Sequence, residues 1–456
     1  MLSCFVTETN MGAIPISVIA QKKFSEWLDV QTAQTKDWLS ATQFQSEAGS
    51  VRLIPDANGK LSRVVCCVAD IDNLWGVGNL PFALPEGLYK FDVTDLQYAS
   101  YAIAWGLGAY QFTRYKKPAR QPAQLYLHTH SAAYVNNIVE SIYLVRDCIN
   151  TPADDMGPSE LAVVAETLAK QYGAQFTQII GEDLLKQNYA SIYTVGRASD
   201  DAPRLLDIRW GNPAHPKVTL VGKGVCFDTG GLDIKSSSYM LLMKKDMGGC
   251  AHVLGLARMI MQAALPVCLR VLIPAVENAV SGNAYRPGDV ITSRKGLTIE
   301  IGNTDAEGRV VLSDALTEAV SEKPELLIDM ATLTGAARVA LGTELPAVFS
   351  NHDQLVHDVI KQGEKIHDSM WRLPLFAMYR ELINSSIADI NNNSSEPYAG
   401  AITAALFLKE FVPDEIPWLH FDLMAWNTRT RPGRPQGGEA MALRALFAYL
   451  ENRYGK

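Results

Sequence analysis

Residues 218–231 read VTLVGKGVCFDTGG, an apolar run followed by glycines that bracket a lysine and an aspartate. The run at 218–221 has counterparts at 269–274, 326–330 and 419–423. Short, continuously apolar runs are typical of strands buried on both faces, as in a parallel sheet covered by helices. Helical patterns lie between them, at residues 249–264, 308–321, 355–366 and 402–411, and another precedes them at 159–172. We therefore expect an α/β domain with a mixed, mainly parallel sheet flanked by helices.

The first quarter of the chain has a different pattern, which indicates a smaller α/β domain. We expect a strand at 14–20, a hairpin of 51–55 and 63–69 around the turn sequence DANG at 56–59, and a helix at 96–112. Residues 113–124 are polar and basic and contain two prolines, which is typical of a linker. The predicted domains are residues 1–124, with the linker at their end, and residues 125–456.

The composition favours a soluble, cytoplasmic protein. The net charge of −8 argues against broad binding to nucleic acid or to an anionic membrane, because both need a positive field. Seven scattered cysteines without a C-x-x-C pair fit reduced thiols better than a disulfide framework. The start shows no basic segment before an apolar run, and no apolar stretch is long enough to cross a bilayer. We expect no membrane partner and consider nucleic acid an improbable one.

A second segment, NTDAEGR at residues 303–309, follows the strand-like run 297–301. In an extended chain Asp305, Glu307 and Arg309 would point the same way. Two converging carboxylates need compensation, and a divalent cation is the usual solution. Helix capping is the alternative interpretation, since acidic residues favour the first turn of a helix. Capping would explain one acid but not a pair together with an arginine.

The glycine-rich turn carries alternatives of its own. A phosphate-binding loop would need glycine at Lys217 and serine or threonine at Gly224, so the spacing does not fit. A tight turn without chemistry is as good an interpretation of this segment alone. Asp246, in the charged run 244–246, would by itself be taken for part of a solvated face.

Taken together, these segments resemble the leucyl (cytosol) aminopeptidases, a family of dinuclear metallopeptidases. The family's seven-residue signature stands intact at 303–309 and continues through VVLSDAL at 310–316. A second block, spaced as in the family, comprises GKG at 222–224, FDTGG at 227–231, IK at 234–235 and KKDM at 244–247. The resemblance extends from about Arg146 to Leu450 and is weak before the linker. An unbroken signature together with a second spaced block is highly specific.

The resemblance implies a centre of two divalent ions, Mn²⁺ or Zn²⁺. Asp228 and Glu307 would bridge them, Asp305 would complete the more exchangeable site, and Lys223 and Asp246 would complete the tighter one. An amine ligand must bind as the neutral form, and the charge of the metal would lower its pKa.

The same resemblance implies roles for residues that do not bind metal. Lys235 would stabilise the developing oxyanion while the metals activate water. Arg309 would hold a bicarbonate ion that relays the proton. Met243, Thr332 and Gly335 would form part of an apolar side-chain pocket. The expected substrates are peptides with a free, apolar N-terminal residue, and the expected assembly is a homohexamer.

Some positions depart from the family pattern, and rival interpretations remain. Ser236 replaces the usual proline and Ser313 the usual alanine, and residues 422–426 replace a longer glycine-containing run; these changes affect the expected substrate preference. The rivals are a non-catalytic or DNA-binding relative of the same family and a nucleotide-dependent enzyme. His128 and His130 are expected to be structural or surface residues, and His252 a packing or capping residue.

Overall fold

The computed structural model describes residues 2–8 and 12–455 and divides into two compact units. One unit comprises residues 1–143 with 429–436, and the other comprises residues 144–428 with 437–456. Helix α5 (Thr129–Asn150) passes from one unit into the other, so this division differs from the expected boundary at residue 124. Residues 113–123 are irregular, as a linker would be, but the strand that follows them still pairs in the N-terminal sheet.

The N-terminal unit is an α/β domain, as predicted. Its six-stranded sheet has the order β1-β6-β5-β2-β4-β3, and β2 pairs in parallel with both β4 and β5. The predicted hairpin is confirmed, since β3 and β4 are antiparallel around the turn at 56–60. The strands are β1 (Phe5–Val6), β2 (Ile14–Ala20), β3 (Val51–Pro55), β4 (Leu61–Val68), β5 (Leu88–Phe91) and β6 (Gln124–Tyr126). The helices are α1 (Phe24–Asp29), α2 (Ala33–Ala41), α3 (Leu80–Ala83) and α4 (Asp95–Gly108).

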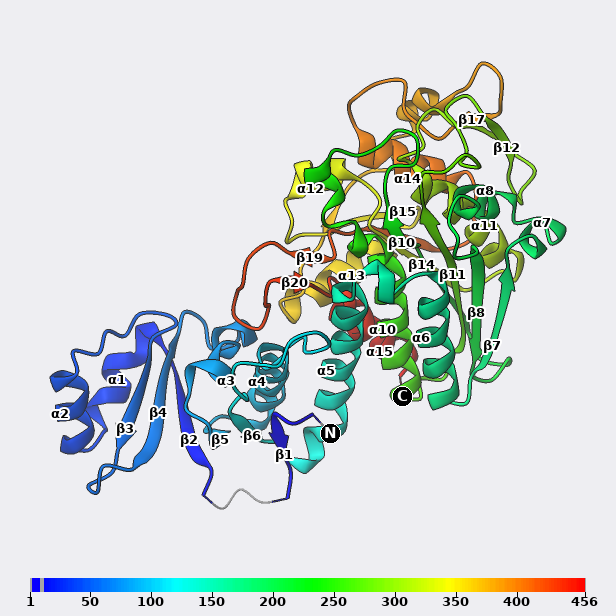
Figure 1. The fold of residues 1–456 in the computed structure, drawn as a ribbon. Helices are drawn as coiled ribbons and strands as arrows, with labels where there is room; N and C mark the ends of the chain where they lie inside the picture. The colour runs from blue at the N-terminus through cyan, green and yellow to red at the C-terminus, as the bar shows by residue number, and fades with distance from the viewer. Residues whose placement is uncertain (1, 9–11, 456) are drawn as a thin grey trace. The chain divides into compact units, whose positions relative to one another are not determined.

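The C-terminal unit is built on the mixed, mainly parallel sheet that the apolar runs predict (Figure 1). All four runs are strands, at the centre of the order β16-β15-β18-β14-β9-β11-β8-β7, and neighbouring central strands are parallel. The sheet becomes antiparallel toward its edges, where β8 pairs with β11 and β7, and β15 pairs with β18. A further strand, β10, pairs in parallel with β11. These strands are β7 (Gln175–Ile180), β8 (Arg204–Trp210), β9 (Lys217–Gly222), β10 (Gly224–Asp228), β11 (Cys268–Asn278), β14 (Leu326–Ala331), β15 (Ala347–Ser350), β16 (Trp371–Arg372) and β18 (Trp418–Asp422).

Helices cover both faces of this sheet. One layer contains α6, α10, α13 and α15, which pack side by side, and the other contains α8, α11 and α14 (Figure 1). Helices α10 and α11 both pack on β9, so this strand is buried on both faces, as its apolar sequence requires. The main helices are α6 (Pro158–Gln171), α8 (Ala190–Gly196), α10 (Gly248–Gln262), α11 (Glu307–Ser321), α12 (Gly335–Leu341), α13 (Asp353–Lys365), α14 (Gly400–Lys409) and α15 (Leu443–Tyr454).

Smaller elements surround the sheet. A three-stranded sheet contains β12 (Val290–Thr292), β13 (Thr298–Glu300) and β17 (Ile390–Asn391), and a pair is formed by β19 (Trp426–Asn427) and β20 (Gly437–Gly438). Within the described part of the chain, no helix combines the length and the apolar character needed to cross a membrane.

Candidate metal centre

The candidate centre lies where the central parallel strands end. Lys223 directly follows β9, Asp228 is the last residue of β10, and Thr332 directly follows β14. In open α/β sheets, the carboxyl ends of the strands are where ligands bind. The sheet order therefore brings three segments that are separated in the sequence together at the carboxyl ends of the central strands.

Glycines allow these segments to approach closely. A Cβ atom on Gly308 would lie 2.6 Å from Nζ of Lys223, so a larger residue at this position would displace the Lys223 side chain from the cluster. Gly230 and Gly231 have φ angles of +88° and +65°, in the left-handed region that L side chains rarely adopt. They turn the chain sharply after Asp228 and bring it back toward residue 305.

The segment 303–309 is not extended, so the prediction that its side chains alternate on one face is wrong. The backbone turns at residues 303–306, where the Asn303 side chain accepts a hydrogen bond from the Asp305 N–H at 2.7 Å. Helix α11 then begins at Glu307. Asp305 and Glu307 still converge, but through this turn and the first helical residue. The turn depends on the distant Asn392, whose amide oxygen accepts from the N–H groups of residues 302 and 303.

The structure brings the five predicted ligand residues together. The carboxylates of Asp228, Asp305 and Glu307 have ligand oxygens within 4.8 Å of one another. Nζ of Lys223 lies 2.7 Å from Oε1 of Glu307 and 2.8 Å from Oδ2 of Asp246. These four carboxylates and one amine form a compact cluster, buried except for the partly exposed Asp305.

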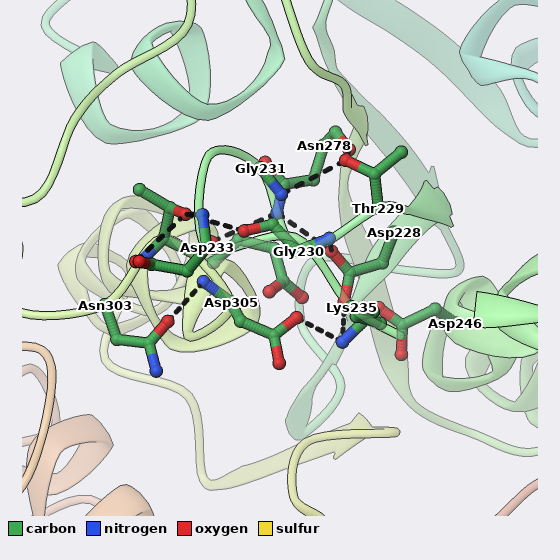
Figure 2. A network of polar contacts seen from close by, with 12 residues as sticks. Asp228, Thr229, Gly230, Gly231, Asp233, Lys235, Asp246, Asn278, Asn303 and Asp305 are labelled. Atoms are coloured by element: carbon green, nitrogen blue, oxygen red, sulfur yellow. Dashed lines mark hydrogen bonds and ion pairs between the residues drawn. The ribbon is translucent and has the colours of Figure 1, made fainter. Parts of the chain in front are cut away.

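Lys235 joins the same cluster from the loop after β10. Its ammonium group lies 2.7 Å from Oδ2 of Asp228 and also contacts Oδ1 of Asp305, as Figure 2 shows. Around it, Asn278 donates to Asp228 at 2.8 Å, and the N–H of Gly230 donates to the same oxygen at 2.9 Å. The ammonium groups of Lys223 and Lys235 therefore offset only part of the charge of the four carboxylates.

Burial and mutual repulsion shift the pKa values of these carboxyl groups. Burial raises the pKa of Asp228 to about 6, with a further contribution from Asp246. Burial and the neighbouring Asp228 raise the pKa of Glu307 well above its usual range. Burial alone would raise the pKa of Asp246, but Lys223 and Lys245 bring it below the ordinary value. The raised pKa values of Asp228 and Glu307 are typical of a buried cluster with more negative than positive charge.

The pKa values of the neighbouring lysines are set by burial, which lowers them, and by the carboxylates, which raise them. Burial would lower the pKa of Lys223, but Asp246, Glu307 and Asp228 raise it above the ordinary value. The same balance of burial against Asp228 and Glu307 raises the pKa of Lys235. The pKa of Lys245 is lowered to about 8, because burial outweighs the attraction of Asp246 and the cations Arg338 and Lys223 lower it further.

The donor set fits divalent cations. Oε2 of Glu307 is buried and has no hydrogen-bond partner among the described residues, although Oε1 of the same carboxylate contacts Lys223. A buried carboxylate oxygen without a partner is costly, and a bound cation would remove that cost. Carboxylate oxygens with a single nitrogen suit Mn²⁺ and Zn²⁺.

Arg309 lies beside the cluster and is almost fully buried. Its Nη1 donates to the carbonyl of Asn392 at 2.8 Å, whereas its Nε is buried without a partner in the described part of the chain. Burial lowers its pKa to about 10, although Glu307 opposes this shift. A buried guanidinium with an unused donor suits a small planar anion such as bicarbonate.

A cavity of about 480 Å³ opens onto the cluster. Met243, Thr332 and Gly335, predicted to form a side-chain pocket, all line it. Thr332 is tied directly to the cluster, because its hydroxyl donates to Oδ1 of Asp246 at 2.8 Å.

Several residues of the site were not predicted. Thr304 accepts from the N–H of Asp233, and its hydroxyl donates to the carbonyl of Gly230, which fixes the loop after β10. Asp422, at the end of β18, accepts from the N–H groups of Leu333 and Thr334, each at 3.1 Å. Arg338 also lines the cavity. Sequence position gave some indication of two of these residues, because Thr304 lies inside the signature and Asp422 ends an apolar run. No sequence pattern indicated Arg338.

The histidines lie outside this centre. His252 is fully buried, with Nδ1 at 2.6 Å from the Gly248 carbonyl and Nε2 accepting from the Met441 N–H, which fits a packing role. Burial lowers its pKa to about 4. His128 stacks on Tyr98 and lies close to His130 and to the exposed Asp95. Stacking accounts for the position of His128 without a ligand role.

Sequence profiles of known families cover most of the chain. Residues 143–447 match the catalytic domain of the cytosol aminopeptidase family, and residues 14–128 match the N-terminal domain of M17 aminopeptidases. A probable cytosol aminopeptidase from Persephonella marina is 34% identical over 90% of this chain and 90% of its own length. Another, from Syntrophotalea carbinolica, is 44% identical over 69% of this chain, and that match spans 64% of the relative's length.

Solved structures match over almost the whole chain. A cytosol aminopeptidase from Coxiella burnetii is 52% identical, with a TM-score of 0.97 over 99% of this chain and 100% of its own. The bottromycin maturation enzyme BotP, in complex with Mn, is 31% identical, with a TM-score of 0.86 over 97% of this chain and 100% of its own. The chain therefore belongs to the cytosol aminopeptidase family.

Proposed function

We propose that this protein is a metal-dependent aminopeptidase that removes N-terminal residues from peptides. The observation that carries the proposal is the convergence of Asp228, Asp246, Asp305, Glu307 and Lys223 on one buried cluster beside an open cavity. Family membership supports the same activity.

These five residues would hold two divalent ions. Bound there, the ions would activate a water molecule at neutral pH and act as Lewis acids toward the peptide carbonyl. The Mn complex of the relative BotP favours Mn²⁺, and Zn²⁺ suits the same donors. Lys223 would have to release its proton to bind a metal, which the field of the ions favours.

Lys235 and Arg309 would act without binding metal. With ions held by Asp228 and Asp305, the Lys235 ammonium group would no longer be needed in its ion pairs with them and would stabilise negative charge on the carbonyl oxygen. Arg309 would hold bicarbonate through its unused Nε donor, and the anion would accept the proton from the attacking water.

The cavity wall favours an apolar N-terminal side chain such as leucine or methionine. Met243 offers a flexible apolar surface, and Thr332 and Gly335 leave room beside it. From the family resemblance we also expect a homohexamer located in the cytoplasm, and light scattering on the purified protein would give the assembly size.

A matched pair of peptides tests the proposal, one with a free N-terminus and one N-acetylated. The free amine has a lone pair for a metal, whereas acetylation delocalises that lone pair, so only the free peptide should lose its first residue. Product analysis by mass spectrometry gives the result. Internal cleavage, or equal rates on both peptides, would exclude an aminopeptidase.

A DNA-binding or non-catalytic relative is the second candidate. The acidic net charge argues against DNA binding, because a duplex attracts a positive surface. The complete set of carboxylates in the cluster argues against a non-catalytic protein. A gel shift at physiological salt, run beside the peptidase assay, separates these functions.

A further inference from the structure

Arg338 is a cation of the cavity wall that the proposed chemistry does not use. It belongs to α12 and lines the cavity, half-buried. Its Nη1 lies 3.7 Å from the sulfur of Met424. In the described part of the chain no carboxylate lies within 4.0 Å of its guanidinium, unlike the paired arginines Arg270 and Arg294 of the same unit. A guanidinium beside a cavity and without an anion is a site for one.

The wall that carries Arg338 begins at the carboxylate cluster. Thr332, at its start, donates to Asp246. Gly335 follows, and a Cβ atom there would lie 3.3 Å from Nη2 of Arg338. Asp422 holds the backbone between them through the N–H groups of Leu333 and Thr334. A residue whose amine binds at the cluster can therefore extend its side chain along a fixed wall toward the guanidinium.

The charge of the cavity favours the same ligand. Five acidic and five basic side chains line it, including the carboxylate cluster and Arg338. Two divalent ions would turn this balance into a clear positive excess. Such a field attracts an anionic side chain and repels a cationic one.

We propose that Arg338 binds the side-chain carboxylate of an N-terminal glutamate or aspartate, so that the enzyme accepts acidic as well as apolar first residues. The methylene groups of glutamate would contact Met243 while its carboxylate accepts hydrogen bonds from Arg338. This inference rests on the proposed aminopeptidase function. It names a substrate class that the apolar part of the pocket does not predict.

The test compares glutamyl, leucyl and lysyl amides of one chromogenic amine, which carry no other carboxylate. Glutamyl and leucyl substrates should be hydrolysed, and the lysyl substrate poorly. Arg338→Met should lower the ratio of glutamyl to leucyl kcat/KM by about 10- to 100-fold, the usual range for one charge-assisted hydrogen bond. Arg338→Lys should recover part of the ratio, and Arg338→Glu should shift preference toward the lysyl amide. Arg286→Met is the control with the same charge change, because Arg286 is exposed, pairs with Asp289 and is not among the residues that line the cavity.

A binding measurement gives an independent readout. L-glutamate should raise the melting temperature of the manganese-loaded wild type more than L-leucine does, and Arg338→Met should remove that difference.

Hydrolysis of the leucyl amide with none of the glutamyl amide, or an unchanged ratio of glutamyl to leucyl kcat/KM in Arg338→Met, overturns the role of Arg338 and leaves the proposed aminopeptidase activity standing. If only a leucyl-glutamate dipeptide depends on Arg338, the guanidinium binds the leaving residue instead, and the inference is also wrong. Failure on every substrate removes the proposed function itself.

Discussion

Glu307→Gln separates the metal-binding role of this residue from its role in the fold. The substitution keeps the shape of the side chain and removes one buried charge. Oε1 of Glu307 accepts from Lys223 at 2.7 Å, an interaction that the amide oxygen of glutamine can keep, and Lys223 retains Asp246 at 2.8 Å. Oε2 has no partner to lose among the described residues. Because burial and Asp228 already raise the pKa of Glu307, its ionised form does not stabilise the metal-free fold. We expect the metal-free variant to melt within about 1 °C of the wild type, which corresponds to less than about 1 kcal/mol for a chain of this length.

The effect on metal binding should be much larger. A unit charge pair at 4 Å contributes about 4 kcal/mol at an effective dielectric constant of about 20, so losing the carboxylate weakens binding of a divalent ion about a thousandfold or more. At Mn²⁺ 100-fold above the wild-type dissociation constant, binding stabilises the wild type by about 2.7 kcal/mol. At the same concentration the variant would gain less than about 0.1 kcal/mol.

Differential scanning fluorimetry with and without Mn²⁺ measures both effects, and hydrolysis of a leucyl amide follows turnover. Glu364→Gln, an exposed glutamate on α13, makes the same charge change away from the site and should behave as the wild type. A Glu307→Gln protein with the full manganese shift and near-wild-type turnover would refute the assignment. A metal-free variant that melts far below the wild type would refute the reasoning on the buried charge.

Two further predictions follow from named contacts. Lys235→Ala should retain metal by elemental analysis while kcat falls by about 10²- to 10³-fold, as for one group that stabilises an oxyanion; loss of metal would instead make Lys235 a ligand. Burial would lower the pKa of His420, but the buried Asp329, whose Oδ1 lies 2.6 Å from its Nδ1, raises that pKa above the ordinary value; Asp422 adds to the rise and Arg309 opposes it. Stability from this pair is complete below about pH 6.5 and is lost as pH rises through the raised pKa, so urea midpoints should fall over that range in the wild type but not in Asp329→Asn; the same slope in both proteins would contradict it.

The central sheet could be predicted from the sequence because its strands carry their own signal. Each of the four apolar runs is a strand, and their bounds agree within a few residues, since burial on both faces demands an unbroken apolar sequence. The antiparallel edge strand β7 was not predicted. Its residues are mostly exposed or half-buried and lack such a run.

The site was predictable in its residue types but not in its geometry. The spaced motifs at 222–247 and 303–309 identified the carboxylates and lysines that the structure brings together. The turn before Glu307 was not predicted, because it is held by Asn392 from a distant part of the chain. A role for Arg338 could not be predicted for a similar reason. Its lack of an ionic partner, within the residues that the structure describes, follows from tertiary packing and has no sequence pattern.

The most direct test of the account is the metal stoichiometry of the dialysed protein titrated with Mn²⁺, followed by electron paramagnetic resonance and elemental analysis. Wild type should bind two ions per chain, of unequal affinity, and peptidase activity should appear as the sites fill. Asp305→Ala should lose the weaker ion, and Asp246→Ala the tighter one. Binding of two ions by either variant with wild-type affinities, or activity in wild-type protein free of divalent metal, would contradict a two-metal centre formed by Lys223, Asp228, Asp246, Asp305 and Glu307.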